Sequence, residues 1–375
     1  CSFHFLFLRL WYELFLSCYN NMNIIFFIPL LIAFLITLIL TYCLIPLIKK
    51  LGILDDPTTH QHPAMLHHKP IPRAGGVPFF LGVLITGILF LPVTPITIAL
   101  FSAAFIALVV GVLDDMFDIS PYIRLTSNVV VGGILVLSGV GINFVTNPFG
   151  GVLHLDTFIL PFTILGLHFI ISLSDIIALV WIVWVMNMLN WSKGVDGQMP
   201  GIVAISSIVI GILSLRFPVA DTNSLIAAHL SFIIAGASLG FLVFNKFPAK
   251  IFPGYSATSI YLLLSVVSIL SGAKLATAIL VMGVPMIDGV FTIFRRVIKG
   301  KSPFKHDKKH LHHILFKLGW GQQKIALFYW CISAILGAIS LLLTSQGKIY
   351  VIIMLCVIVG GGLLFLHFVL ENKDE

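Results

Sequence analysis

Two adjacent aspartates at the end of a long apolar run are the first candidates for chemistry. Asp114 and Asp115 directly follow the run 103–113. Two ionised carboxylates next to hydrocarbon are unfavourable unless a cation offsets them. Mg²⁺ binds one or two protein carboxylates and completes its coordination with water and phosphate oxygens, so the pair is a candidate metal site for Mg²⁺, or for Mn²⁺ in its place. The alternative is an exposed acid pair that simply ends a membrane span.

A second polar group follows a later apolar run. Asn187 and Asn190 share one face of the helix expected there, at a spacing of i and i+3, and Lys193 and Asp196 follow in the loop. Amide and carboxylate groups in that loop could hydrogen-bond to a nucleotide or a sugar. The alternative is a helix C-cap with Gly194 as its left-handed residue, which requires neither both asparagines nor Asp196.

Three histidines stand in the most basic loop of the chain. His310 and His313 fall on one face with Asp307 at i, i+3 spacing, and His312 lies beside them. The nearby cations are Arg295, Arg296, Lys299, Lys301, Lys305, Lys308 and Lys309. Imidazoles can donate to a diphosphate or move a proton, and arginines bind phosphate oxygens through two N–H groups. Zinc is the competing interpretation, but no cysteine is near and the lysines would repel a cation.

The first polar loop combines four histidines with two cations. The histidines are His60, His62, His67 and His68, and alone they are more typical of a solvated loop than of a metal site. Lys69 and Arg73 are held by two prolines and followed by Gly75-Gly76, which we expect to be flexible. The two cations are therefore candidates to hold an anion beside the start of the next helix.

Membrane spans must position these groups. The chain has 375 residues, of which 59% are hydrophobic and 10% charged, and its mean hydropathy is +1.08. That composition excludes an ordinary soluble domain. A bilayer core of about 30 Å needs roughly 20 apolar residues in a helix. We therefore predict an all-α polytopic membrane protein of about 11 transmembrane helices, at 24–48, 77–93, 96–113, 126–141, 175–190, 201–216, 224–244, 256–271, 274–294, 325–344 and 348–370.

The segment between the fourth and fifth predicted spans differs from the rest. Residues 143–160 carry Asn147-Pro148 and Gly150-Gly151 between β-branched and aromatic residues, which predicts a small extracytoplasmic β-hairpin. Residues 158–172 are apolar enough for another span, but the charge distribution argues against one. We expect 22–375 to form a single multi-span domain, and we interpret 1–21 as an N-terminal extension or an interfacial helix without an assigned function.

The distribution of basic residues predicts the orientation. With the N-terminus outside, only Arg9, Arg216, Lys274 and Lys348 of the 22 Lys and Arg lie outside, and the other 18 are cytosolic, as the positive-inside rule favours. The candidate residues and the C-terminus would then face the cytosol. The net charge of +7 could meet anionic headgroups or a phosphorylated substrate, although topology alone would account for most of the lysines.

Taken together, these loops resemble the polyprenyl-phosphate N-acetylhexosamine-1-phosphate transferases, the membrane enzymes of glycosyltransferase family 4 that are related to phospho-N-acetylmuramoyl-pentapeptide transferase. The resemblance covers residues 45–325 and includes KPIPRAGG at 69–76, DDMFDISPYIR at 114–124, NMLNWSKGVDG at 187–197, FNKFPAKIFPG at 244–254 and DKKHLHHILFKLG at 307–319. Five motifs in the expected order are far more specific than any one of them. The His-Leu-His-His form is more similar to the N-acetylhexosamine branch.

The resemblance implies a phosphotransferase that moves an N-acetylhexosamine 1-phosphate from a UDP-sugar to undecaprenyl phosphate on the cytosolic membrane face and releases UMP. The product would begin a cell-wall or surface glycan. Its partners would be the UDP-sugar and the polyprenyl phosphate, with no nucleic acid, and a homodimer is one assembly that it leaves open. The resemblance also implies residue roles. Mg²⁺ and the acceptor phosphate would be served by Asp114 and Asp115, and the nucleotide would be positioned by Asn190, Asp196 and Asn245. The side chains that would face phosphates are Arg124, Arg295, Arg296, His310, His312 and His313.

Two positions depart from the pattern of that family. The middle loop usually reads Asn-x-x-Asn-x-x-Asp-Gly-x-Asp-Gly, but Lys193 stands in place of the first aspartate. The loop before the eighth span usually ends Met-Gly-Asp-x-Gly-Ser, but Tyr255 stands in place of an aspartate that the resemblance implies is a metal ligand. The site is thereby shifted by about three charge units in the positive direction. One hypothesis is that the Lys193 ammonium partly replaces the cation.

Two other functions stay open. A protein with these loops and an altered charge could bind a donor or a lipid phosphate without turnover. A transporter or flippase is a third hypothesis, but transporters place ionisable residues near the membrane midplane. Mid-span charges are nearly absent here, and Asp288 after Pro285 is the nearest candidate. The acid pair, Asp196 and the histidines favour an enzyme.

Overall fold

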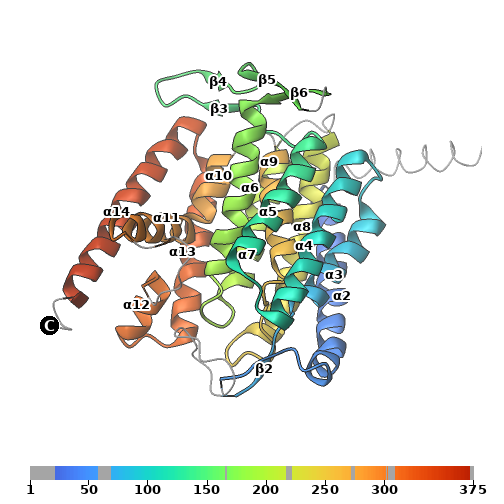
Figure 1. The fold of residues 1–375 in the computed structure, drawn as a ribbon, viewed down its shortest axis with the longest axis vertical. Coiled ribbons are helices and arrows are strands. Elements are labelled where there is room, and N and C mark those ends of the chain that lie inside the picture. The colour runs from blue at the N-terminus through green and yellow to red at the C-terminus, as the bar shows by residue number, and fades with distance from the viewer. Residues whose placement is uncertain are drawn as a thin grey trace, which may run out of the picture.

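The computed structural model describes residues 22–57, 69–164, 167–216, 222–271, 275–300, 302 and 309–371. Several predicted features lie outside these residues. They are the extension 1–21, the four histidines of the first loop, Asp307, Lys301, Lys305 and Lys308. Most helices run side by side along one direction, with two β-hairpins at one end and the β2 and α12 segments at the opposite end (Figure 1).

The described residues are mainly helical. The helices are α2 (Met22–Lys50), α3 (Gly76–Phe90), α4 (Pro95–Phe117), α5 (Pro121–Leu137), α6 (Leu173–Trp191), α7 (Gln198–Ser214), α8 (Thr222–Asn245), α9 (Thr258–Leu270), α10 (Leu275–Val281), α11 (Gly283–Ile298), α12 (Leu311–Lys317), α13 (Gln322–Leu342) and α14 (Ser345–Glu371). The strands are β1 (Leu54–Asp55), β2 (Ile71–Pro72), β3 (Phe144–Thr146), β4 (Val152–His154), β5 (Ile159–Ile164) and β6 (Leu167–Ser172), paired as three antiparallel two-stranded sheets.

The helices are those of a polytopic membrane protein. Six helices in the described part of the chain are long and apolar enough to cross a membrane, or up to seven if the bent pair α10 and α11 counts as one span. Four shorter apolar helices, α3, α5, α7 and α9, coincide with four predicted spans. Because they are shorter than the roughly 20 residues that a bilayer core requires, the total of 11 crossings stays a prediction.

One predicted span is wrong as a continuous helix. The segment 274–294 is broken at Met282, and α11 turns by 84° from α10. Gly283 and Pro285 lie in the first turn of α11. The N–H groups of a first helical turn have no partner within the helix, so a proline there costs no helical hydrogen bond. Figure 1 shows α11 crossing the direction of its neighbours, so its C-terminal end does not continue along the bundle axis.

The polar segment between α5 and α6 forms two hairpins. The predicted hairpin is present as β3 and β4, with Phe144 opposite His154. Residues 158–172 form the second hairpin, β5 and β6, rather than a membrane span, in agreement with the charge argument. An all-α fold is therefore too narrow a description, and the side of the membrane on which the hairpins lie stays a prediction.

The core lies on α9, whose residues are buried along the whole helix. The outer helices α2 and α14 instead carry exposed apolar side chains, including Leu31, Ile39, Val357 and Phe365. Apolar side chains on the outside of a helical bundle are those expected to contact lipid. Buried residues therefore gather on inner helices, and the loops at the helix ends hold the polar candidates.

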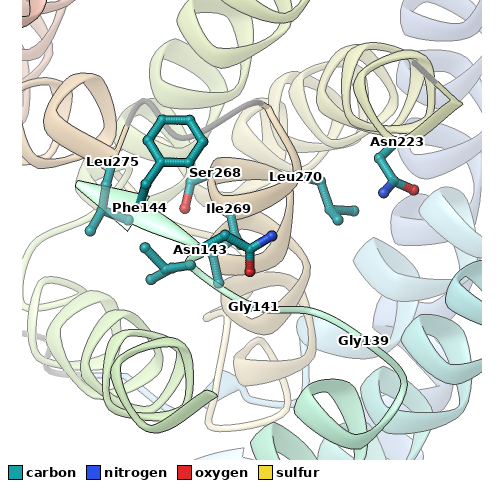
Figure 2. Close-up of a pocket in the computed structure, with 10 residues that line it drawn as sticks. Gly139, Gly141, Asn143, Phe144, Asn223, Ser268, Ile269, Leu270 and Leu275 are labelled. Carbon is teal, nitrogen blue, oxygen red and sulfur yellow. The ribbon is translucent and has the colours of Figure 1, made fainter. Parts of the chain in front are cut away.

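A small cavity lies at the hairpin end of the bundle. Its lining includes Gly139, Gly141, Asn143, Phe144 and Leu275, together with the last turn of α9 (Figure 2). These residues stand at the ends of α5 and α9 that are opposite to Arg124 and Tyr255. The cavity is therefore separate from the predicted site.

Candidate functional site

Helix α4 ends at the acid pair. It begins with Pro95 after a Thr94 cap that forms a reciprocal capping box with Thr97, and it ends at Asp118, whose φ of 47° is left-handed. Asp114 and Asp115 occupy the last turn with exposed fractions of 1% and 5%. The alternative of an exposed acid pair is therefore wrong, because both carboxylates are buried and need partners.

Arg124 is the partner of Asp114. Helix α5 starts at Pro121, and its first turn brings Arg124 Nε to 2.5 Å from Asp114 Oδ1. The same guanidinium donates through Nη2 to Asp118 Oδ1 at 2.6 Å. Arg124 thus closes the short connection between α4 and α5, and its charge offsets the buried carboxylate of Asp114.

Backbone N–H groups hold Asp115. Tyr255 N donates to Asp115 Oδ1 at 2.7 Å, and Ser256 N donates to Asp115 Oδ2 at 3.1 Å. Arg73 Nε lies 3.7 Å from Oδ1. Gly254 makes this approach possible, because its φ is +67° and an added Cβ would lie 2.2 Å from Asp115 Oδ2. The carboxylate is therefore oriented by the loop before α9.

Two glycines bring that loop against the start of α3. Gly75 N donates to Phe252 O at 3.0 Å, and Gly76 N donates to Pro253 O at 2.9 Å. A Cβ on Gly76 would lie 2.1 Å from the backbone carbon of Ser256. The expectation of a flexible Gly-Gly pair is therefore wrong: these glycines permit close backbone packing, which also carries Arg73 to the acid pair.

The two residues that depart from the family pattern lie together. The Lys193 ammonium is 5.9 Å from the centroid of the Tyr255 ring, and Arg124 Cζ is 5.3 Å from the same centroid. Asn128 Nδ2 donates to the Tyr255 hydroxyl at 3.1 Å and fixes the ring. Both cations lie within the distance at which an aromatic ring attracts them. Tyr255 therefore lies beside the acid pair, and Arg124 and Lys193 are both near its ring.

Burial changes the acidity of both departing residues. It lowers the pKa of Lys193 to about 8, against the opposing effect of the Asp115 carboxylate. Burial also raises the pKa of Tyr255 to about 12. Near pH 7 most Lys193 side chains therefore carry a charge, while the Tyr255 phenol is neutral.

The loop after α6 is tied to three other segments. Asp196 Oδ2 accepts from Ala249 N at 2.9 Å, and Gln322 Oε1 accepts from Asp196 N at 3.1 Å. Asn245 accepts from Gly197 N at 3.1 Å and donates to Ile251 O at 2.8 Å. Asp196 and Asn245 therefore hold the loops in place, and their contact with a nucleotide stays a prediction.

The two asparagines of α6 differ in their surroundings. Asn187 donates to Val183 O of its own helix at 2.8 Å. Asn190 Oδ1 is buried, and no protein group in the described residues donates to it. A buried acceptor without a donor is rare in proteins. Of the two, Asn190 is thus the one with an acceptor available for a substrate N–H or O–H.

The histidines lie against the same loop. His312 belongs to α12 and has an exposed fraction of 2%, with its ring 4.2 Å from His313 and 5.7 Å from His310 between centroids. A Cβ on Gly194 would lie 2.0 Å from His312 Nε2. Gly194 has no left-handed φ, so the C-cap interpretation is wrong, and the glycine instead makes room for His312.

His312 is predominantly neutral. Burial lowers the pKa of its imidazole below the usual value, and His313 and His310 lower it further. A neutral imidazole has one nitrogen that donates and one that accepts a hydrogen bond. Since Lys193 faces the acid pair and the adjacent Gly194 packs on His312, the loop after α6 brings the acids and the histidines into one region.

Asp288 is a site residue that the sequence suggested only as a mid-span charge of a transporter. Its Oδ2 lies 2.8 Å from His310 Nδ1, and its Oδ1 accepts from Leu311 N at 3.0 Å. Thr292 Oγ1 is a weaker neighbour of the same ring nitrogen at 3.4 Å. Asp288 therefore orients His310 and the start of α12. The helix break at Met282 could have drawn attention to it, but the pairing across 22 residues could not be predicted from spacing.

Three of the cations that were predicted to bind phosphate lie on α11 and in the first polar loop. Arg295 and Arg296 lie in the last turn of α11, where Arg296 is buried and Arg295 is half-buried. Lys69 is exposed. Their contact with phosphates stays a prediction.

The residues around the acid pair do not fit a divalent metal in this arrangement. Arg73, Arg124 and Lys193 already offset the charges of Asp114, Asp115 and the exposed Asp118, and N–H groups engage both oxygens of Asp115. Mg²⁺ favours carboxylate oxygens that are open to it. Within the described residues, no group of three or more His, Cys, Asp or Glu side chains is placed to hold a metal ion.

Comparison with known proteins identifies the family. The model described as glycosyl transferase family 4 matches residues 97–272. The undecaprenyl-phosphate alpha-N-acetylglucosaminyl 1-phosphate transferase of Thermotoga maritima is 30% identical over 343 residues, which cover 91% of this chain and 97% of that protein. The probable undecaprenyl-phosphate N-acetylglucosaminyl 1-phosphate transferase of Bacillus subtilis is 28% identical over 333 residues, covering 85% and 86%. The chain, a multi-span membrane protein, therefore belongs to glycosyl transferase family 4.

Proposed function

We propose that the protein transfers an N-acetylhexosamine 1-phosphate from a UDP-sugar to a polyprenyl phosphate, with undecaprenyl phosphate as the acceptor. The observation that carries the proposal is the buried acid pair in the last turn of α4, with Arg73, Arg124 and Lys193 beside it. The names of relatives that share nearly the whole length of the chain support it.

The chemistry is a displacement at phosphorus. An oxygen of the acceptor phosphate forms a bond to the β-phosphorus of the donor, and the bond from that phosphorus to the UMP oxygen breaks. Charge stabilisation and alignment dominate such reactions. The guanidinium groups and the ammonium would bind phosphate oxygens, and the neutral His312 could accept or return a proton near them. The Mg²⁺ or Mn²⁺ that the family resemblance implies does not fit the residues around Asp114 and Asp115, so no step of this reaction is assigned to a metal ion.

The proposed site faces the cytosol, where nucleotide sugars are made, and the acceptor tail lies among apolar helices. The excess of basic residues in the loops on that side supports this orientation. Most candidate residues gather in loops and near helix ends, which disfavours a transport path through the middle of the bundle. The lipid product would begin a cell-wall or surface glycan.

Purified protein with undecaprenyl phosphate and a panel of UDP-N-acetylhexosamines tests the proposal. We expect UMP release with at least one donor, and movement of sugar radiolabel into an organic-extractable lipid. Omission of the lipid should abolish both signals. Absence of UMP release with every donor would contradict the transferase function.

The altered charge around Tyr255 supports one alternative, a protein that binds donor or lipid phosphate without turnover. The two departures place a lysine and a phenol beside the acid pair. Calorimetric binding of UMP together with no UMP release from any donor would favour this alternative over the enzyme.

We expect Asp288→Asn to slow UMP release. The substitution removes the charge that faces His310 Nδ1 and leaves one oxygen to serve two donors. Loss of a hydrogen bond between a charged and a polar group costs about 10-fold in rate or more. Thr292→Val is the control, since it removes only the 3.4 Å contact and should change the rate little. Equal rates in Asp288→Asn and wild type would contradict a positioning role.

A further inference from the structure

We infer that the Lys193 ammonium supplies the fixed positive charge at the acid pair, in the place where a divalent metal ion would otherwise be required. The inference rests on the proposed function, since it concerns what neutralises phosphate at that site. It makes the chain a metal-independent member of its family with respect to phosphate binding at Asp114 and Asp115.

The placement of Lys193 is the first support. Lys193 follows α6 in a loop that is anchored a few residues later, where Asp196 hydrogen-bonds to Ala249 and Gln322 and Gly197 donates to Asn245. The half-buried side chain reaches the Tyr255 ring and interacts electrostatically with both Asp115 and Asp114. An ammonium held there can offer three N–H donors to a phosphate.

Tyr255 is the second support. Its backbone N–H already binds Asp115, and its ring is fixed by Asn128. The phenol is neutral and offers a π face to the cation, whereas a carboxylate at this position would add a ligand for a metal ion. Both departures therefore make a metal ion less necessary at the acid pair. Lys193 adds a cation, and Tyr255 removes an oxygen ligand and places its ring next to that cation.

The charge balance is the third support. Three cationic side chains, Arg73, Arg124 and Lys193, lie beside two buried carboxylates and the exposed Asp118 that shares Arg124, so the local charge is balanced before any ligand binds. A divalent ion would therefore find carboxylates whose charge is already offset by resident cations, whereas the Lys193 ammonium can still donate to a phosphate oxygen. Replacing Lys193 and Tyr255 with aspartates would shift the balance to a net negative charge, which is the condition under which Mg²⁺ binds.

The test measures metal binding and nucleotide binding separately from turnover, on the full-length purified chain. Electron paramagnetic resonance reports bound Mn²⁺, and calorimetry reports UMP affinity in the presence of EDTA. For the wild type we expect no stoichiometric Mn²⁺ and an unchanged UMP affinity in EDTA. The double variant Lys193→Asp/Tyr255→Asp should bind one Mn²⁺ per chain and lose UMP affinity when EDTA is added.

Single substitutions keep the test decisive even if the double variant fails to fold. Lys193→Met preserves the length of the side chain and should weaken UMP binding in EDTA by about 10-fold, as expected for a lost charge-assisted contact. Lys324→Met is the matched control: the same substitution at this exposed lysine in the first turn of α13 should leave both measurements unchanged.

Stoichiometric Mn²⁺ binding by the wild type, loss of its UMP affinity in EDTA, or unchanged UMP affinity in Lys193→Met would each overturn the inference. These outcomes are distinct from failure of the proposed function. A wild type that binds UMP without metal but never releases UMP from a donor would refute the transferase and leave the role of Lys193 intact.

Discussion

Asp115→Asn is expected to reduce UMP release at least on the order of 100-fold, the loss typical of a preorganised electrostatic group. Asparagine has nearly the same shape, but its amide nitrogen would face the N–H group of Tyr255 or Ser256, so that one donor opposes another. The substitution also leaves Arg73 without its nearest carboxylate. The site would lose the negative charge of Asp115, and the loop before α9 would lose the carboxylate that orients it.

Asp118→Asn is the matched control for this prediction. Asp118 stands at the end of the same helix and contacts Arg124, but its side chain is 62% exposed. A solvent-exposed ion pair contributes only about 0 to 1 kcal/mol, so the rate should fall by no more than about fivefold. Size-exclusion profiles of both variants check that they fold. A wild-type rate in Asp115→Asn, or equal losses in both variants, would contradict the assigned role of Asp115.

The positions of the long helices could be predicted from the sequence. The spans 96–113 and 175–190 differ by a few residues from α4 and α6, and the caps Thr94-Pro95 and Ser172 are recognisable signals. The broken span is harder to predict, because 274–294 is mostly apolar and Gly283, Pro285 and Asp288 are among its few interruptions. The second hairpin was missed because an apolar strand and an apolar helix have the same composition.

The residue types of the site were predictable, but many of its contacts were not. A carboxylate pair after a span indicates a site, yet the N–H groups that bind Asp115 come from Tyr255 and Ser256, about 140 residues away in sequence. The direction of a backbone N–H depends on the tertiary fold, which no local pattern specifies. The sequence leaves a C-cap open as the alternative role of Gly194 for the same reason, since only the fold reveals His312 beside it.

Gly194→Ala should cost nearly as much activity as removal of His312 itself. The added Cβ would lie 2.0 Å from His312 Nε2, a distance that no real contact tolerates. His312 cannot easily yield, because its ring is buried and is in contact with the rings of His310 and His313. Displacing a catalytic group by about 1 Å can cost on the order of 100-fold. We therefore expect large losses of UMP release in both Gly194→Ala and His312→Ala.

A double-substitution cycle separates this steric effect from general damage to the loop. In the His312→Ala background the imidazole is gone and the Cβ of Ala at position 194 has room, so adding Gly194→Ala should change the remaining rate by less than about twofold. Gly133→Ala is the control for a glycine substitution, because nothing lies within 4 Å of its added Cβ. Additive losses in the double variant would mean that Gly194 acts through the backbone of its loop and not through His312.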